Sequence, residues 1–200
     1  MNELPDLITE LTSGDDLRAV DAVHRLSTLG ALALPAVKDL FDCKDPDTRW
    51  WATWALAEIQ DPQVPFLLKK ALSDPDLGVR QAAALALRKH PDPEAVPDLI
   101  AILEGANPGV AIPCDPTLMH LTVAALIAAG ETAVPELIRP LQNGSQPARV
   151  MAARALALIG DKRAIPALST ALDSDSAVLE YWAAEGLERM GIGMTFMKPE

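Results

Sequence analysis

Apolar residues recur along this 200-residue chain at the spacing of short amphipathic helices. A proline opens each apolar stretch, and leucine, isoleucine, valine or phenylalanine residues follow on one helical face. Proline is favoured in the first turn of a helix, because the N–H groups of that turn have no intrahelical partner. The intervals between these prolines are 30, 30, 32, 38 and 31 residues, which predicts six helices starting near Pro5, Pro35, Pro65, Pro97, Pro135 and Pro166.

A second, alanine-rich helix is expected after each proline-led helix. Polar residues such as Asp45-Pro46 and Asp74-Pro75 separate the two, and they are residue types that turn a chain and cap helix N-termini. Most alanine-rich stretches end at a glycine, which can take the left-handed conformation that follows a helix. Neither helix of such a pair can bury its apolar face alone, so the pairs must stack.

The pattern predicts an all-α solenoid of about six helical hairpins. The expected units span about residues 1–30, 31–61, 62–92, 93–131, 132–161 and 162–191. The interval of 38 residues reflects an insertion at 105–116 in the fourth unit. Insertions of this kind lie at one edge of the groove in solenoids, so we expect this one there. An extended tail, residues 192–200, is expected to cover the exposed end of the array.

Four stretches carry a resemblance to HEAT repeats of the phycobilisome-lyase-like type, the PBS lyase HEAT-like repeats. They are Ala133 to Ile138, Asp45 to Arg49, Asp74 to Arg80 and Ala152 to Asp161, and the resemblance covers about residues 4–191. It implies a right-handed α–α superhelix, a HEAT-like solenoid, whose second helices line a concave groove. In resembling repeats a recurrent arginine bonds across the stack, here Arg49, Arg80 and Arg149. The resemblance implies no single function, because similar arrays serve as scaffolds, bilin lyase subunits, an iron hydroxylase and DNA glycosylases.

Charge argues against two classes of partner. The chain has 17 Lys and Arg against 28 Asp and Glu, a net charge of −11, which repels nucleic-acid phosphates and anionic lipid surfaces. We therefore expect no nucleic acid as partner. We expect no membrane either, since the first residues show no secretory pattern and Pro116–Gly130 is too short to cross a bilayer. Cys43 and Cys114 are far apart with no neighbouring histidine, which favours free thiols and a cytoplasmic location.

No catalytic motif is evident in the sequence. The iron hydroxylase branch would need His-Glu pairs, whereas the three histidines precede arginine, proline and leucine. We therefore predict no catalytic residue, no metal site and no cofactor, and favour a protein that is not an enzyme. A reactive role for Cys114, at the end of the 105–116 insertion, stays open.

The informative positions in a repeat array are those where one unit departs from its siblings. Aligning the second helices on their ends gives two positions that are expected to face the groove and that are largely apolar or aromatic here, where resembling repeats usually carry polar residues. Trp50 and Trp54 share one helix face, with Trp51 on the packing face, and the alternative is that this pair is covered by a neighbouring helix. The expected partner-binding residues are Trp50, Trp54, Leu85, His120, Arg154 and Tyr181.

Two functional hypotheses follow from these residues. The first is a cytoplasmic, non-enzymatic scaffold, adaptor or assembly factor that binds a protein segment in the groove of the second helices. The alternative, allowed by the resemblance, is a bilin-lyase-like or bilin-handling subunit. It would hold a tetrapyrrole among Trp50, Trp54, His120 and Tyr181, with Arg154 near the propionates.

Overall fold

The computed structural model describes residues 3–105 and 115–193, and within these ranges the chain forms α-helices and short 3-10 helices with no strand. The predicted all-α fold is confirmed. By its internal contacts the chain divides into two compact units, Met1–Ala95 and Val96–Glu200. Most of the expected 105–116 insertion, including Cys114, lies outside the described residues, as does the tail beyond Gly193.

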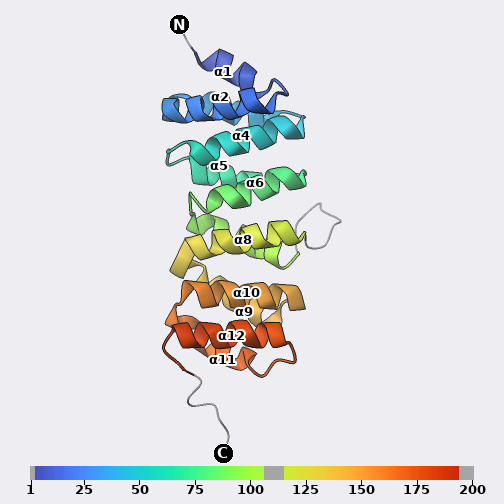
Figure 1. The fold of residues 1–200 in the computed structure, drawn as a ribbon, viewed down its shortest axis with the longest axis vertical. Coiled ribbons are helices and arrows are strands. Elements are labelled where there is room, and N and C mark those ends of the chain that lie inside the picture. The colour runs from blue at the N-terminus through green and yellow to red at the C-terminus, as the bar shows by residue number, and fades with distance from the viewer. Residues whose placement is uncertain (1–2, 106–114, 194–200) are drawn as a thin grey trace, which may run out of the picture. The chain divides into compact units, whose positions relative to one another are not determined.

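The first unit consists of helical hairpins stacked in chain order (Figure 1). Its second helices lie side by side, α2 against α4 and α4 against α6. Its helices are α1 (Leu4–Leu11), α2 (Asp16–Leu29), η1 (Gly30–Leu32), α3 (Leu34–Asp39), η2 (Leu40–Asp42), α4 (Pro46–Glu58), α5 (Val64–Ala71), α6 (Leu77–Leu87) and η3 (Pro93–Ala95).

The second unit repeats this arrangement, with α8 against α10 and α10 against α12. Its helices are α7 (Val96–Leu103), α8 (Pro116–Ala129), η4 (Gly130–Thr132), α9 (Val134–Asn143), α10 (Gln146–Ile159), η5 (Lys162–Ala164), α11 (Ile165–Ala171) and α12 (Ala177–Arg189). The repeat limits given above, from 1–30 to 162–191, stay a prediction.

Capping side chains fix where the second helices begin. At α2, α4, α6, α8 and α12 the side chain of the N-cap residue accepts a hydrogen bond from a backbone N–H of the first turn. Counting from the cap, the fifth and ninth residues of every second helix share one face. The fifth residues are Val20, Trp50, Gln81, His120, Val150 and Tyr181, and the ninth are His24, Trp54, Leu85, Ala124, Arg154 and Glu185.

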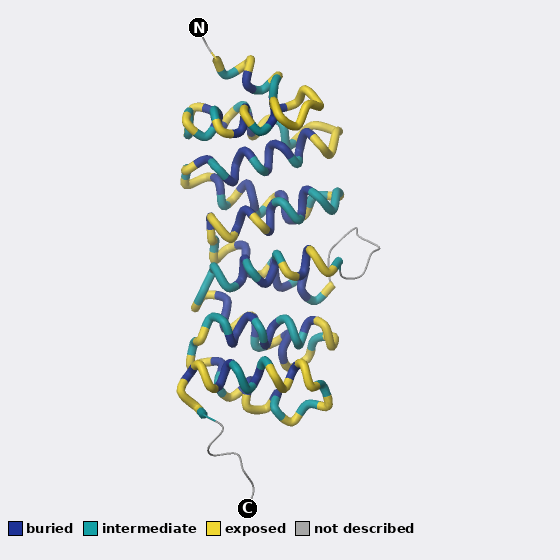
Figure 2. The backbone as a smooth tube through the Cα atoms, viewed as in Figure 1, coloured by how far each residue is buried: buried dark blue, intermediate teal, exposed yellow. Residues whose placement is uncertain are grey.

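The opposite faces of these helices are buried, and most of the alanines lie there (Figure 2). Small side chains let neighbouring helices approach closely. At Gly186 of α12 a Cβ atom would lie 3.0 Å from the Cα of Ala157 in α10 and 2.9 Å from a methyl group of Leu168. This close contact explains a glycine inside a helix, where it otherwise costs about 1 kcal/mol relative to alanine.

A buried ion pair joins two repeats of the first unit. Arg49 of α4 donates from Nε and Nη2 to the carboxylate of Asp74, at 2.7 and 2.9 Å, in the turn before α6. Both side chains are at most 10% exposed. Arg49 thus makes the bond across the stack that the resemblance implied, whereas Arg80 and Arg149 donate to backbone carbonyls within their own hairpins.

Candidate functional site

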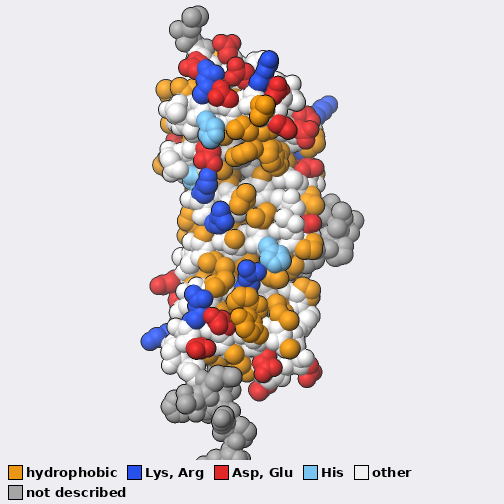
Figure 3. Space-filling model, in the orientation of Figure 1, with side chains coloured by type: hydrophobic (Ala, Val, Ile, Leu, Met, Phe, Trp, Pro, Cys, Tyr) orange, Lys and Arg blue, Asp and Glu red, His pale blue; other side chains and the backbone are white. Residues whose placement is uncertain are grey.

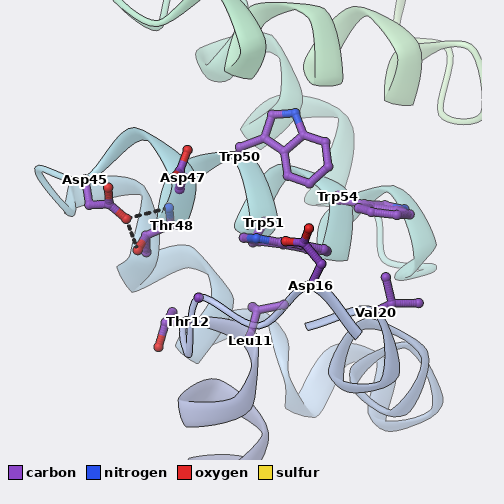
Figure 4. Close-up of a pocket in the computed structure, with 11 residues that line it drawn as sticks. Leu11, Thr12, Asp16, Val20, Asp45, Asp47, Thr48, Trp50, Trp51 and Trp54 are labelled. Carbon is purple, nitrogen blue, oxygen red and sulfur yellow. Dashed lines mark hydrogen bonds between the residues drawn. The ribbon is translucent and has the colours of Figure 1, made fainter. Parts of the chain in front are cut away.

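A cavity of about 580 Å³ opens between α2 and α4 of the first unit (Figure 4). Its walls come from the end of α1, the α1–α2 turn, the first half of α2, the turn before α4 and the first three turns of α4. Its volume lies within the range of about 300–1,000 Å³ that is usual for small-molecule pockets. The lining residues are Leu11, Thr12, Gly14, Asp16, Val20, Asp45, Asp47, Thr48, Trp50, Trp51 and Trp54.

Three tryptophans of α4 form one side of this cavity. The rings of Trp51 and Trp54 are stacked, with centroids 5.1 Å apart and planes 9° apart. Trp50 meets both rings edge to face, at 4.9 and 5.2 Å. Trp51 is 9% exposed, while Trp50 and Trp54 are half-buried. Each ring thus contacts the other two, and the cluster still offers aromatic surface to a ligand.

The structure differs from the sequence-based expectation at Trp51. This residue is buried, as expected for the packing face, but its ring stacks on Trp54 and lines the cavity. Trp50 is partly covered by the neighbouring helix, since its Cδ1 lies 3.6 Å from the position of a Cβ on Gly78 of α6. The tryptophan pair is thus neither fully core nor fully exposed.

The rim of the cavity is acidic. Asp45 caps α4 and accepts hydrogen bonds from the Thr48 hydroxyl and backbone N–H, at 2.7 and 2.9 Å. The bond from the Thr48 hydroxyl is the main reason why the pKa of Asp45 lies below its usual value. Asp16 and Asp47 are exposed on the same rim, and the lining residues include no lysine or arginine. A ligand here meets flat aromatic surface and hydrogen-bond acceptors.

A second aromatic cluster lies in the other unit, on α10 and α12. The Arg154 guanidinium of α10 lies 5.4 Å from the ring centroid of Trp182. Tyr181, 58% exposed, meets the same indole edge to face at 5.3 Å. Hydrophobic side chains gather over α2 and α4 in the first unit and over α10 and α12 in the second (Figure 3). Trp182 escaped the sequence reasoning, although its position, six residues after the N-cap, is that of Trp51.

The remaining predicted residues lie apart from these clusters. Leu85 of α6 is 44% exposed in the first unit and does not line the cavity. His120 of α8 is exposed in the second unit, where its Nδ1 lies 2.7 Å from the carbonyl oxygen of Pro116. The six predicted residues therefore contribute to two separate clusters and two isolated positions.

The described parts of the chain contain no candidate metal site and no candidate membrane-spanning helix. Within residues 3–105 and 115–193, no group of three or more His, Cys, Asp or Glu side chains is placed to hold a metal ion. Over the same ranges, every helix is too short or too polar to span a bilayer.

Comparison with known proteins identifies relatives in bilin metabolism. The chain is 37% identical over 119 residues to phycocyanobilin lyase subunit beta of Nostoc sp. strain PCC 7120, an alignment over 58% of this chain and 54% of the relative. It is 32% identical over 127 residues to phycocyanin alpha phycocyanobilin lyase CpcF of Synechocystis sp. strain PCC 6803, covering 63% and 56%. The chain thus spans about half the length of these relatives.

A solved structure shares the fold. The complex of CpcE and CpcF of phycocyanin lyase from Nostoc sp. PCC7120 aligns with a TM-score of 0.56 at 24% identity, over 92% of this chain and 76% of that one. These relatives contradict two expectations. Lyase subunits among them favour the bilin-lyase alternative over a non-enzymatic scaffold or adaptor, and they overturn the preference for a protein that is not an enzyme. Residue patterns alone did not reveal this, because the repeat fold serves both functions.

A family model described as HEAT repeats matches residues 34–112 and 114–188, which is most of the chain. The resemblance noted in the sequence is confirmed by this match and by the lyase relatives. The chain belongs to the HEAT repeat family.

Proposed function

We propose that this chain acts as a subunit of a phycocyanobilin lyase and holds the tetrapyrrole in the cavity between α2 and α4. The observation that carries the proposal is the three-tryptophan wall of that cavity. Similarity to two phycocyanobilin lyase proteins supports the choice of ligand.

The lining of the cavity fits the chemistry of a linear tetrapyrrole. Conjugated pyrrole rings are flat and apolar, and they gain from stacking on tryptophan faces. Their N–H groups are donors, and the carboxylates of Asp16 and Asp47 are acceptors on the rim. The Asp45 carboxylate is already engaged with Thr48, so its main role is to fix the start of α4 and with it the direction of the tryptophans.

The chain's own residues would orient and shield the bilin. The stacked Trp51 and Trp54 rings provide a preformed surface, which reduces the ordering cost of binding. A protein partner belongs to the same proposal, because one relative is named as a lyase subunit and the solved neighbour is a two-protein complex.

Titration with phycocyanobilin tests the binding site. The bound pigment should quench tryptophan fluorescence and change its own visible absorbance. The double variant Trp50→Ala/Trp54→Ala should weaken binding by about tenfold or more, since each aromatic contact contributes about 0.5–1.5 kcal/mol. Phe66→Ala is the matched control, because Phe66 lies on α5 of the same unit, is 65% exposed and does not line the cavity. If the double variant binds phycocyanobilin as tightly as the wild type, the bilin does not bind at this tryptophan wall.

Complementation tests the lyase role itself. The phycocyanin alpha subunit, phycocyanobilin and the Nostoc lyase with its beta subunit replaced by this chain are combined, and covalent pigment is measured on the denatured phycocyanin. Pigmented phycocyanin supports the proposal. The lyase role would be contradicted if the chain binds bilin but no covalent pigment forms on phycocyanin, whether the chain is added alone or with a lyase subunit.

A further inference from the structure

The second unit contains a cavity of about 410 Å³ between the start of α10 and the turn that leads into α12. This volume lies within the range of about 300–1,000 Å³ that is usual for small-molecule pockets. No residue of the tryptophan cavity takes part in it, so it is a separate candidate site. Its lining is polar and consists of Gln146, Arg149, Asp173, Ser174, Asp175 and Ser176.

The first unit shows what fills this place in an equivalent pair of helices. α10 packs on α12 as α4 packs on α6 (Figure 1). Arg149 follows the N-cap of α10 by four residues, as Arg49 follows the N-cap of α4. Ser174 precedes the N-cap of α12 by two residues, as Asp74 precedes the N-cap of α6. Ser174 thus stands where the first unit has the carboxylate partner of its buried arginine.

The two turns share a hydrogen bond, which supports this equivalence. In the second unit the Ser176 N–H donates to the Ser174 hydroxyl at 3.3 Å. In the first unit the Asp76 N–H donates to the Asp74 carboxylate at 2.8 Å. The turn is therefore retained, and the exchange of aspartate for serine removes a carboxylate from the wall beside the arginine.

Arg149 consequently has no carboxylate partner among the residues that the structure describes. Arg49 donates two hydrogen bonds to Asp74, at 2.7 and 2.9 Å, whereas Arg149 donates from Nε to the Leu141 carbonyl oxygen at 3.2 Å. Within 3–105 and 115–193 the two terminal nitrogens of Arg149 bond to no other group of the chain. Arg149 is also half-buried at the wall of the cavity. A guanidinium in this position is a ready donor to an external anion.

We infer that this cavity binds a carboxylate group of an external ligand through Arg149, in the place that corresponds to the Asp74 carboxylate in the first unit. The guanidinium presents two parallel N–H groups that match the two oxygens of a carboxylate. The two serine hydroxyls and the amide of Gln146 are further donors in the lining. The carboxylate belongs to a small free acid or to an acidic side chain of a protein partner. This site is independent of bilin binding in the first unit.

The charges of the lining favour a singly charged ligand. Asp173 and Asp175 also line the cavity, and both are exposed. With one positive and two negative side chains in the lining, a second negative charge on the ligand adds more repulsion than attraction. A carboxylate should therefore bind more tightly than hydrogen phosphate.

Titration with sodium acetate at constant ionic strength tests the site, with the backbone N–H resonances of Ser174 and Ser176 followed by NMR. Saturating shifts are expected in the wild type, and Arg149→Gln should weaken binding about tenfold or more, since a hydrogen bond to a charged group contributes about 1.5–3 kcal/mol. Lys162→Gln is the control for general loss of positive charge, because Lys162 is exposed in the same unit. Equal affinity in wild type and Arg149→Gln overturns the inference.

Ser174→Asp provides a sharper test, because it supplies the missing carboxylate from the chain itself. The new side chain should pair with Arg149 and abolish the response to acetate. Ser174→Ala is the matched control and should still bind acetate, since the arginine stays unpaired. Acetate binding by Ser174→Asp as tight as that of the wild type would contradict the assigned place of the ligand.

Two further comparisons identify the ligand. In the wild type at mildly alkaline pH, tighter binding of sodium phosphate than of acetate would overturn the preference for a carboxylate. The N-acetylated tripeptide amide Gly-Asp-Gly is compared with acetate and with its asparagine counterpart. Tighter binding of the aspartate peptide than of acetate supports a protein side chain as the source, and the reverse order supports a small free acid. Equal binding of the aspartate and asparagine peptides would overturn carboxylate recognition.

Discussion

Removing the carboxylate of Asp74 should destabilise the first unit strongly. In Asp74→Ala the Arg49 guanidinium loses both of its charged hydrogen bonds, at 2.7 and 2.9 Å. It keeps only the carbonyl oxygens of Cys43 and Lys44, each 3.0 Å from Nη1. The Asp76 N–H, 2.8 Å from the lost carboxylate oxygen, loses its acceptor as well.

The magnitude follows from burial. Breaking a buried ion pair by removing one partner costs about 3–5 kcal/mol, because the other charge stays out of water and unpaired. Arg49 is 8% exposed and keeps two carbonyl acceptors, which places the expected cost near the lower end, about 3 kcal/mol. That is a large part of a typical stability of about 5–15 kcal/mol.

Urea unfolding followed by far-UV circular dichroism measures the effect, with Arg49→Met and the double variant completing a cycle. Arg49→Met places an apolar side chain in the arginine's surroundings, so the double variant should be more stable than Asp74→Ala alone. A loss below about 1 kcal/mol in Asp74→Ala would refute the reasoning, because it would mean that the pair behaves as an exposed one. A double variant no more stable than Asp74→Ala would show that the stranded charge is not the cause.

The Arg49–Asp74 pair should also make stability depend on pH. Burial acts to raise the pKa of Asp74, but the hydrogen bonds from Arg49 and the Asp76 N–H hold that pKa below its usual value. The stability difference between wild type and Asp74→Ala should therefore be constant above about pH 5 and shrink as pH falls below about 4, and a difference that grows on acidification would contradict this. Trp51→Ala should cost about 3–5 kcal/mol in urea melts and Trp54→Ala about 1–2, since only the former is buried; equal costs would argue against the observed packing. Gly186→Ala should cost about 1 kcal/mol, because overpacking against Ala157 outweighs the gain in helix propensity, and a stabilised variant would show that α10 and α12 can move apart.

The fold was accessible from sequence because its determinants are local. Prolines lie in the first turns of α1, α3, α5, α9 and α11, and aspartates cap α2, α4, α6 and α8. These residues can be read directly from the sequence, and each acts within a few residues. The register of the second helices puts Trp50, Trp54, Arg154 and Tyr181 on one face of their helices, so these residues could be named in advance. None of these steps needs knowledge of a distant contact.

The sites were less accessible because they depend on contacts across helices and on ring orientation. Helical periodicity put Trp51 on the packing face, but only its rotamer decides that its ring stacks on Trp54. The Arg154 contact with Trp182 joins α10 to α12 and has no signature in either helix alone. The choice between scaffold and lyase failed for another reason, since it concerns a ligand, and aromatic grooves suit peptides and pigments alike.

The common register of the capped helices has a consequence for how such a protein can diverge. The fifth and ninth residues after each N-cap lie on the outer face of the helix, while buried residues between them pack against the neighbouring helices. A substitution at an outer position that is exposed, as at Leu85, His120 or Tyr181, can change what the surface recognises with little effect on the packing beneath it. Ligand preference can thus drift one repeat at a time, by exchanges as drastic as tryptophan for glutamine at the fifth position, while the scaffold keeps its shape.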